Sequence, residues 1–337
     1  MIKTIKLEGF KCFYDLSLEL NWLTVLTGLN NSGKSSVIQA LRMMENSFHN
    51  SDSIQIEGHG TDEEIHNKFH DSNIILGITD SKGKEFITEI LLDNKNKAYT
   101  KKKNEFSFPE IIYVSANRYG PKTSIPIYTE KSKKHTIGPN GENTLQCIEI
   151  FSNSILDKRL IHEKSEGDTF FYNLRGWLSE ISPNVKFDYS IEKPSDSSYT
   201  TFNGYRATNV GYGLSYTLPI LVALLVGTLI PNSIVILENP EAHLHPKGQT
   251  AIAKLISLCA NIGTQIIVET HSDHIFNGIR IETKNLSGLY NKVKVHWFEV
   301  NDQDVEIFTP NINSKGKIDL WPKNFFDQFE INSSKLI

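Results

Sequence analysis

The sequence has few cysteines and no apolar run long enough to cross a membrane. Its three cysteines, Cys12, Cys147 and Cys259, lie far apart without a CxxC spacing, which argues against a disulfide framework and a zinc site. The longest apolar run, residues 218–230, is shorter than the roughly 20 residues that span a bilayer, and the first residues lack the apolar core of a signal peptide. A cytoplasmic protein with no membrane partner is therefore expected.

The net charge is also small. At −4, the chain as a whole has no positive field that would draw it onto nucleic acid, so any DNA or RNA contact must be local. Two lysine clusters are candidates, residues 101–103 and the group Lys131, Lys133 and Lys134, because clustered cations release counterions from a phosphate backbone. The alternative is that both clusters are solvated loops.

Apolar spacing predicts an α/β fold. Alternation with a two-residue period near the N-terminus predicts antiparallel strands at the start of the fold. Residues 45–110 mix short strand-like runs with charged turns and are predicted to form a variable antiparallel lobe. Residues 141–208, with helical patterning over 143–185, are predicted to form an inserted and mostly helical lobe.

The last third of the chain predicts a parallel unit and a hairpin. Residues 234–237, the amphipathic helix after them and residues 265–269 follow one another as strand, helix and strand, which predicts a right-handed βαβ unit. A hairpin-like pair then begins a short C-terminal β subdomain at 291–337. We expect one domain over residues 1–337 that contains these parts.

A glycine-rich loop follows a predicted buried strand at 23–27 and precedes a helix. The run GLNNSGKSS, residues 28–36, matches G-x-x-x-x-G-K-[ST] in the strand, loop and helix context of a phosphate-binding motif. Lys34 is expected to reach the β- and γ-phosphates and Ser35 to bind magnesium, while loop amides and the helix dipole face the phosphates. The predicted phosphate-binding residues are Gly28, Asn30, Asn31, Ser32, Gly33, Lys34, Ser35 and Ser36.

Two later strands end in acidic and imidazole side chains. The run SIVILENPEAHLHP, residues 233–246, places Glu238 at the carboxyl end of a strand, where ligands meet open α/β sheets. Glu238 is predicted to hold magnesium, and Glu241 to orient or deprotonate the attacking water. In TQIIVETHSDH, residues 264–274, His271 could sense the γ-phosphate, with a satisfied imidazole at a strand end as the alternative. A further alternative is a metal site made by His243, His245, His271 and His274, although no repeated ligand spacing favours it.

Three motifs in this order, GLNNSGKSS, VILENPEAHLHP and VETHSDHI, resemble those of ABC/SMC ATPase heads. More narrowly, the chain resembles prokaryotic AAA family ATPases related to the overcoming-lysogenization-defect (OLD) group. Its tail from Gly316, GKIDLWPKNFFDQF, resembles the C-terminal domain of unknown function that ends many of them. The resemblance implies an α/β P-loop NTPase of ABC/SMC head type, with a mixed sheet, an antiparallel N-terminal β-lobe and an inserted helical lobe. It also implies ATP and Mg2+ as cofactors and a homodimer formed through the ATP site.

In that superfamily the second subunit contributes a signature loop that precedes a helix. The candidate here is NVGYGLSYTLP, residues 209–219, where Gly211 and Gly213 would permit close approach to phosphate and Ser215 would present a hydroxyl. A glycine turn before a core helix is the alternative. The usual LSGGQ is absent, so transporter coupling is not expected. No glutamine loop is identifiable, and Asn117 and Arg118 are its predicted substitute, because a guanidinium at a strand end suits a phosphate or a carboxylate.

The superfamily's catalytic glutamate directly follows the metal carboxylate, and Asn239 holds that place here. An amide cannot accept the proton, so hydrolysis is expected to be slow or to depend on Glu241 or Glu238. The resemblance implies regulation of a separate effector, such as a nuclease, in a prokaryotic anti-phage or DNA-related defence system. Alternatives are an ATP-sensing module with little hydrolysis, a nuclease-associated ATPase acting on DNA, and a GTPase or small-molecule kinase, although no Asn-Lys-x-Asp guanine loop is present.

Overall fold

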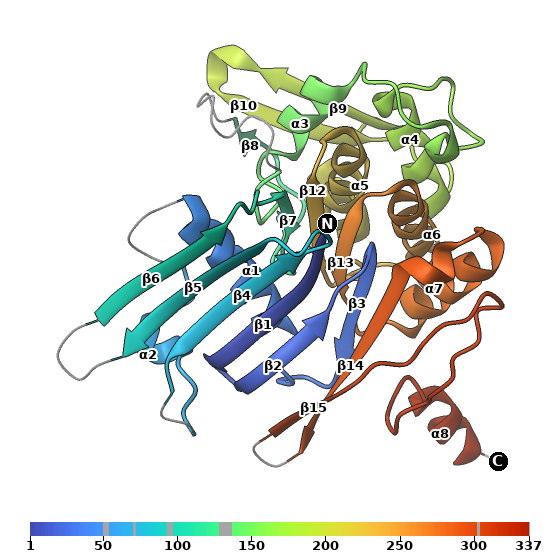
Figure 1. The fold of residues 1–337 in the computed structure, drawn as a ribbon. Helices are drawn as coiled ribbons and strands as arrows, with labels where there is room; N and C mark the ends of the chain where they lie inside the picture. Colours follow the sequence, from blue (N-terminus) through green and yellow to red (C-terminus); the bar gives the residue numbers. More distant parts are fainter. Residues whose placement is uncertain (50–53, 70–71, 93–96, 128–136, 302–303, 337) are drawn as a thin grey trace. The chain divides into compact units, whose positions relative to one another are not determined.

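The computed structural model describes residues 1–49, 54–69, 72–92, 97–127, 137–301 and 304–336. Figure 1 shows the helices and strands of these residues, which divide into two compact units. The first unit comprises Met1–Ile111, Val293–Asn311 and Ile318–Ile337, and the second comprises Ile112–Lys292 and Ile312–Lys317. The predicted lysine contacts at Lys131, Lys133 and Lys134 lie outside the described residues.

The first unit contains an antiparallel sheet whose strands follow the order β2 (Phe13–Glu19), β1 (Ile2–Phe10), β4 (Ile74–Asp80), β5 (Glu85–Leu92) and β6 (Lys97–Asn104). The alternating apolar residues near the N-terminus form β1 and β2, with Leu7 opposite Leu16, which confirms the predicted antiparallel start. β4 pairs with β1, so the strands within 45–110 extend this sheet. A short helix, α2 (Asp62–Ile65), precedes β4.

A second set of strands in this unit joins the two ends of the chain. β3 (Leu23–Gly28) is buried along its whole length and pairs in parallel with β14 (Val293–Asn301). β14 forms the predicted hairpin with β15 (Asp304–Phe308). The predicted C-terminal β subdomain therefore shares a sheet with β3, and α8 (Gln328–Ser334) follows it. α1 (Lys34–His49) contacts β3, β4 and β5, and so lies against both sets of strands of the first unit.

The second unit contains the predicted βαβ unit. β12 (Ser233–Glu238) and β13 (Gln265–Glu269) pair in parallel on either side of α6 (Pro246–Ile262) in the chain, which confirms the prediction. Their register places Glu238 opposite Glu269, so both strands end at the same level. β7 (Glu110–Val114) lies next to β12 in the strand order, and its residues from Ile112 onward belong to the second unit. α7 (Asp273–Asn285) packs on α6.

The region 141–208 contains strands as well as helices. The predicted helical patterning corresponds to α3 (Thr144–Phe151) and α4 (Phe170–Ile181). A small sheet of β8 (Ile125–Pro126), β9 (Phe187–Glu192), β10 (Ser197–Phe202) and β11 (Tyr205–Arg206) accompanies them. Asn203 and Gly204, with φ of 54° and 78°, make the left-handed turn between β10 and β11 that an Asn-Gly pair favours. Short 3-10 turns lie at Lys158–Leu160, Lys193–Ser195, Ala207–Asn209 and Leu289–Lys292.

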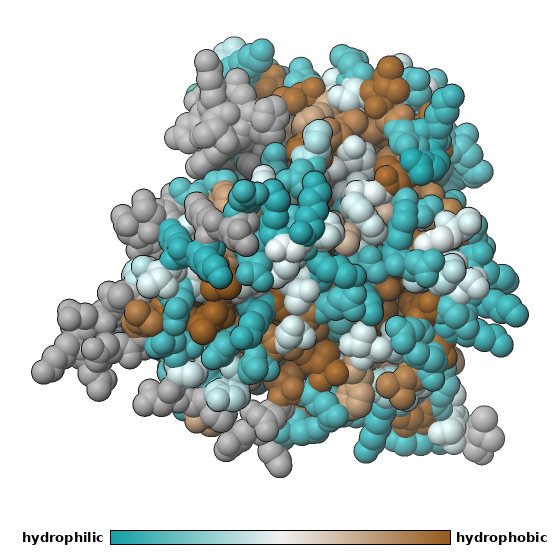
Figure 2. Space-filling view, in the orientation of Figure 1, coloured by the Kyte–Doolittle hydropathy of each residue, from teal (hydrophilic) through white to brown (hydrophobic). Residues whose placement is uncertain are grey.

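The most apolar helix is α5 (Tyr212–Leu229). Among the described helices, it is the one long and apolar enough, by these two properties alone, to cross a membrane. Most of the apolar run at 218–230 lies in this helix, which begins earlier, at Tyr212. Residues 217–227 of α5 are buried, and the helix contacts α3, α4, α6 and β12, as a core helix does. Hydrophilic residues cover much of the surface shown in Figure 2, with smaller hydrophobic areas between them.

Candidate functional site

The phosphate loop lies between β3 and α1 in the first unit, and two glycines fix its path. Gly28 and Gly33 have φ of 146° and 90°, in the range that favours glycine. A Cβ at Gly28 would lie 2.2 Å from the carbonyl oxygen of Phe298, and a Cβ at Gly33 would lie 2.6 Å from Cys12 Sγ. Neither position has room for a larger residue. Asn30 and Asn31 lie between them and are exposed.

Lys34 is buried at the start of α1, and its ammonium group turns back onto the loop. Nζ donates hydrogen bonds to the carbonyl oxygens of Gly28 (3.2 Å) and Leu29 (2.6 Å) and to Ser32 Oγ (3.2 Å). An ammonium group has three donors and no acceptor, so these oxygens take the places that phosphate oxygens can fill. Together with the glycine backbone and the positive end of α1, the donors of this ammonium group fit the phosphates of a nucleoside triphosphate. Half-buried Ser35 and Ser36 follow on the first turn of α1.

The turn between β1 and β2 lies beside the phosphate loop, and the sequence does not predict it as part of the site. Lys11 has a left-handed backbone, and its Nζ donates to Gln39 Oε1 on α1. Burial lowers the pKa of Lys11. Cys12 is free, and its Sγ lies against Gly33. In the sequence this turn is only a Lys-Cys pair between two predicted strands, and such a pair does not indicate a phosphate site.

Glu238 ends β12 in the second unit, and two donors hold its carboxylate. Oε1 accepts from the hydroxyl of Tyr113 (3.0 Å), and Oε2 accepts from the backbone N–H of Ala116 (3.1 Å). The side chain is half-buried, and its two oxygens have further lone pairs beyond these bonds. A held carboxylate of this kind suits a hard cation such as Mg2+.

Asn239 takes the place after Glu238 in an unusual backbone conformation. Its φ is 44°, a left-handed value that asparagine tolerates better than most residues. Its N–H donates to the carbonyl oxygen of Glu269 (2.9 Å). Its Oδ1 is buried and has no hydrogen-bond partner among the described residues. The amide is therefore directed into the protein, as expected for a residue that does not activate water.

Glu241 and His271 are brought together, as the sequence predicts for two strand ends of one sheet. Glu241 Oε2 accepts from Thr270 Oγ1 (2.8 Å), and Oε1 accepts from the backbone N–H of His271 (2.9 Å). Burial raises the pKa of Glu241, against the effect of these hydrogen bonds and of the Arg118 charge. A carboxylate with a raised pKa is a stronger base than an ordinary one. The His271 side chain itself is exposed.

Arg118 is buried, and its guanidinium contacts the protein backbone. Its side chain is only 2% exposed, and its NH1 and NH2 groups donate to backbone carbonyl oxygens. These hydrogen bonds hold the guanidinium on the backbone, and its role toward a phosphate or an interface carboxylate stays a prediction. Asn117, the other predicted substitute for a glutamine loop, is exposed.

The predicted signature residues lie at the N-terminus of α5, and they do not share one environment. Gly211 is exposed, and a Cβ there would meet no atom within 4 Å, whereas a Cβ at Gly213 would lie 2.8 Å from the carbonyl oxygen of His243. Ser215 Oγ is buried without a hydrogen-bond partner among the described residues. Ser215 lines a small pocket with Leu218, and its role toward a nucleotide stays a prediction.

The four histidines of the alternative metal site have other surroundings. His243 packs its ring on Tyr216, with centroids 4.6 Å apart, and His245 Nδ1 accepts from the N–H of Lys247 at the start of α6 (3.3 Å). His274 lies 3.7 Å from Asp273. Within the described ranges, no group of three or more His, Cys, Asp or Glu residues could hold a metal ion. The structure therefore gives no support to a histidine-based metal site.

The lysine cluster at 101–103 lies on β6, at one end of the strand order of its sheet. Lys101 Nζ donates to the backbone carbonyl oxygen of Ser47 (2.6 Å), so at least this cation has a structural role. Lysines on an edge strand also discourage pairing with another chain, which is the simpler explanation of the cluster.

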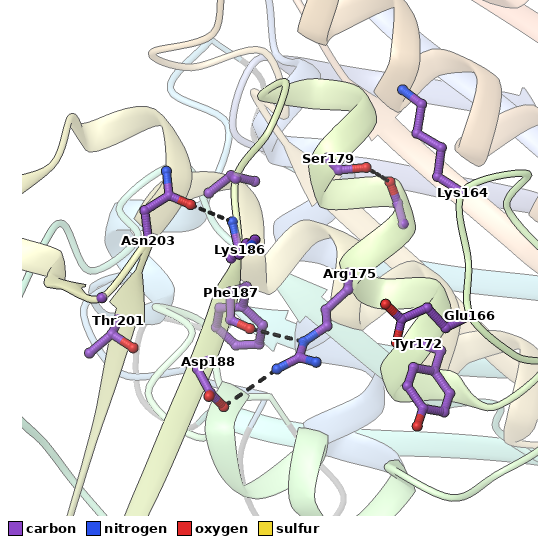
Figure 3. A pocket seen from close by; sticks show the side chains of 13 residues that line it. Lys164, Glu166, Tyr172, Arg175, Ser179, Lys186, Phe187, Asp188, Thr201 and Asn203 are labelled. Atoms are coloured by element: carbon purple, nitrogen blue, oxygen red, sulfur yellow. Dashed lines mark hydrogen bonds and ion pairs between the residues drawn. The ribbon is translucent and has the colours of Figure 1, made fainter.

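A groove of about 770 Å3 lies in the second unit and is not part of any predicted motif (Figure 3). Arg175 of α4 lies in it, with Nε donating to the carbonyl oxygen of Phe187 (3.0 Å) and NH2 3.7 Å from Asp188 Oδ1. The volume is within the range of small-molecule sites. The groove is lined by Lys164, Glu166, Tyr172, Arg175, Gly176, Ser179, Val185, Lys186, Phe187, Asp188, Thr201, Asn203 and Gly204.

Three family models match successive parts of the chain. Residues 1–166 match the family described as "AAA ATPase domain", and residues 156–277 match the family described as "AAA domain, putative AbiEii toxin, Type IV TA system". Residues 290–336, which include the tail from Gly316, match the family "Protein of unknown function (DUF3696)". No curated protein matches the chain.

Solved structures of SMC head domains share the fold. An SMC head bound to the C-terminal winged-helix domain of ScpA has 15% sequence identity and a TM-score of 0.51, covering 93% of this chain and 98% of that one. The SMC head of Pyrococcus furiosus, with an extended coiled coil and bound to the C-terminal domain of ScpA, has 12% identity and a TM-score of 0.53, covering 100% and 99%. At these identities the likeness concerns the fold alone. Two segments of the chain therefore match AAA-family ATPase domain models, and the chain has the fold of SMC head domains.

Proposed function

We propose that this protein binds MgATP, hydrolyses it slowly as a homodimer formed through the ATP site, and regulates a separate effector protein. The cytoplasm of a prokaryote and an anti-phage or DNA-related defence system are the proposed setting, on the basis of the family resemblance. The observation that carries the proposal is the buried ammonium group of Lys34, which is surrounded by oxygen atoms of a glycine-fixed loop at a helix N-terminus. That arrangement suits a polyphosphate.

The described residues suggest a division of roles. Lys34 and the loop amides would bind the phosphates, with Ser35 and Glu238 as the magnesium ligands. Magnesium, when bound, would neutralise phosphate charge during hydrolysis. Glu238 is suited to this role because Tyr113 and the N–H of Ala116 hold its carboxylate in one orientation.

Glu241 is the proposed proton acceptor for the attacking water. Glu241 follows the strand end that carries Glu238, burial raises the pKa of its carboxylate, and Thr270 and His271 fix its orientation. Asn239 cannot take this role, because an amide does not accept a proton and its oxygen is buried. We expect slow turnover because the proposed base, Glu241, does not directly follow the metal carboxylate as the superfamily's catalytic glutamate does.

ATP binding and ATP turnover, measured separately, test this proposal. Lys34→Ala is expected to lose both, whereas Glu238→Gln and Glu241→Gln should retain binding of a fluorescent ATP analogue and lose most turnover. Glu163→Gln, an exposed position of the second unit, is the matched control and should behave as wild type. Turnover of Lys34→Ala at the wild-type rate, or a preference for GTP, would contradict the proposal.

An ATP-sensing module is the second candidate function, and the buried amide of Asn239 favours it. In that case wild-type turnover would be indistinguishable from that of Lys34→Ala, although the analogue still binds to the wild-type protein.

Dimerisation and the effector need their own measurements. Light scattering of Glu241→Gln with and without MgATP should show a monomer that becomes a dimer, because the trapped nucleotide is not turned over. A monomer under both conditions would exclude the dimer. Affinity capture from the native host in the presence and absence of ATP should then recover an effector in a nucleotide-dependent way, and binding of a DNA fragment that weakens with salt would reveal a nucleic-acid contact.

A further inference from the structure

Arg118 is the residue on which several segments of the second unit converge. We propose that Arg118 is a positioning residue for ATP hydrolysis, which holds the backbone of Glu238 and Asn239 and thereby fixes the direction of the Glu238 carboxylate. This inference rests on the proposed function, since it names a residue that acts through the predicted magnesium ligand.

The hydrogen bonds of the guanidinium define this role. NH1 donates to the carbonyl oxygen of Ser115 (2.7 Å) and to that of Glu238 (2.7 Å). NH2 donates to the carbonyl oxygen of Asn239 (2.8 Å). One rigid side chain therefore joins the segment after β7 to two successive residues at the end of β12. Nε is buried without a partner among the described residues, so the side chain makes fewer bonds than it could.

The turn that Arg118 holds is one that needs support. Asn239 has a left-handed backbone, which costs free energy unless neighbouring structure maintains it. Loss of the guanidinium would leave the carbonyl oxygens of Glu238 and Asn239 without these donors. A part-buried carbonyl that loses its donor is unfavourable, so the turn would move to reach water or another partner.

The same segment also holds the carboxylate itself. Ala116, two residues before Arg118, donates its N–H to Glu238 Oε2 (3.1 Å). Glu238 is thus held at its backbone by Arg118 and at its side chain by Ala116. A displacement of this segment would change both contacts together, and the carboxylate would lose its fixed direction.

The surroundings of Arg118 maintain its charge and its place. Burial lowers its pKa to about 10, while Glu241, Tyr216 and Glu238 act in the opposite direction, so the group is charged at neutral pH. Its Cζ lies 5.3 Å from the ring centroid of Tyr216 on the first turns of α5. The Tyr216 ring in turn contacts the ring of His243, which follows Glu241 in the same turn region. Arg118 is therefore placed between the start of α5 and the end of β12.

Lysine cannot replace this arrangement, although it keeps the charge. A guanidinium is planar and presents its donors in a fixed fork, whereas an ammonium group is a compact point charge on a flexible chain. Arg118→Lys is therefore the informative variant, because it retains the cation and removes the geometry.

Steady-state kinetics at varied Mg2+ concentration test the proposal. A misplacement of about 1 Å can lower turnover by about 100-fold, and we expect Arg118→Lys to lower kcat by about that factor. The Mg2+ concentration for half-maximal turnover should rise, while KM for ATP stays close to wild type and the protein remains folded at the assay temperature. Arg175→Lys is the matched control, since Arg175 also donates to a backbone carbonyl, that of Phe187, and lies over an aromatic ring, that of Phe171 (4.4 Å).

Each outcome decides the proposal. A folded Arg118→Lys with wild-type kcat and Mg2+ dependence overturns it, as does a loss that Arg175→Lys reproduces. If Arg118→Lys does not fold, Tyr216→Leu keeps the arginine and removes its ring partner, and an unchanged Mg2+ dependence in that variant overturns the proposal. Wild-type turnover by Lys34→Ala and Glu238→Gln would instead refute the proposed function, independently of Arg118.

Discussion

The carboxylate of Glu241 accepts a hydrogen bond from the backbone N–H of His271, with Oε1 and N 2.9 Å apart. This bond joins the turns that follow two parallel neighbours, β12 and β13, whose register places Glu238 opposite Glu269. Residues 30 positions apart in the sequence therefore meet because two strands end at one level. The same bond orients a carboxylate whose pKa is raised by burial.

Turnover should depend on the protonation of Glu241. Since its pKa is raised, the base is lost on acidification at a higher pH than for an ordinary glutamate, and turnover of the wild type should fall there. Glu241→Gln should lower kcat by about 100-fold or more, since general-base catalysis contributes at least that factor, and should remove this acid limb. A pH profile of kcat for both proteins provides the measurement. An acid limb that persists unchanged in Glu241→Gln would assign the base elsewhere.

Gly33→Ala should damage both the fold and the phosphate loop. A Cβ would lie 2.6 Å from Cys12 Sγ, at a φ of 90°, and the combined strain and overpacking should cost about 3 kcal/mol in the free energy of unfolding. Gly83→Ala is the matched control in the same unit. Its φ is 76°, but a Cβ there would meet no atom within 4 Å, so it should cost only about 1 kcal/mol. Denaturant titration measures both, and ATP affinity should fall only for Gly33→Ala. Equal losses in the two variants would argue against the packing explanation.

His296 should make the protein sensitive to acid. It is buried on β14 between Thr309 Oγ1 (2.9 Å from Nδ1) and the carbonyl oxygen of Glu19 (2.8 Å from Nε2), and burial lowers its pKa to about 4. The folded-state pKa of His296 lies below the unfolded value of about 6.5. The contribution of His296 to the free energy of unfolding is therefore complete above pH 6.5 and is lost as the pH falls towards 4. Stability should fall by about 2 kcal/mol between pH 7 and pH 5 from this group.

Substitution of His296 separates its contribution to the acid sensitivity from that of other groups. In His296→Gln the free energy of unfolding should be lower at pH 7 and should change less between pH 7 and pH 5. His274→Gln, at a half-exposed position on α7, should keep the wild-type slope. A wild-type slope in His296→Gln as well would show that other groups cause the acid sensitivity.

Glu45 on α1 should have the opposite pH dependence. Burial raises its pKa to about 7, with Glu110 adding to the effect and Arg42 and a backbone hydrogen bond from Ile111 opposing it. Because the pKa of Glu45 is raised in the folded state, its contribution to the free energy of unfolding is full below its unfolded-state pKa and is lost as the pH rises through about 7. Glu45→Gln should therefore raise the free energy of unfolding at pH 8 by about 2 kcal/mol relative to wild type, and by less at pH 5. Thermal denaturation at the two pH values measures this. The exposed control Glu57→Gln should change neither value, and an equal gain at both pH values in Glu45→Gln would contradict the ionisation argument.

Local pattern predicts the parts of the structure that depend on local contacts. The two-residue period finds β1 and β2, the helical period finds α6, and the glycines of the phosphate loop require the backbone angles that Gly28 and Gly33 adopt. The acidic strand end at Glu238 and its neighbour at β13 are predictable for the same reason, because a βαβ unit has one common arrangement.

The features that depend on distant pairing could not be predicted in this way. Lys11 reaches Gln39 because the β1–β2 turn folds back beside α1, and nothing within either segment specifies that contact. The sequence around Arg118 indicates a cation at a strand end, but it does not indicate that the guanidinium donates to the carbonyl oxygens of Glu238 and Asn239, about 120 residues away. The small sheet β8 to β11 also depends on a strand of two residues, Ile125–Pro126, which is too short to leave a period in the sequence.

The parallel pairing of β3 with β14 has a consequence for how the chain folds during synthesis. β3 emerges from the ribosome early, but its partner is made only after nearly all of the second unit. The first unit can therefore not pair β3 with β14 until Val293–Asn301 has been made, whereas most of the second unit, Ile112 to Lys292, precedes that strand and can begin to fold before then. Nascent chains that stop short of Val293 would leave a buried-type apolar strand, residues 23–28, without this neighbour, and such chains are natural clients for chaperones and proteases.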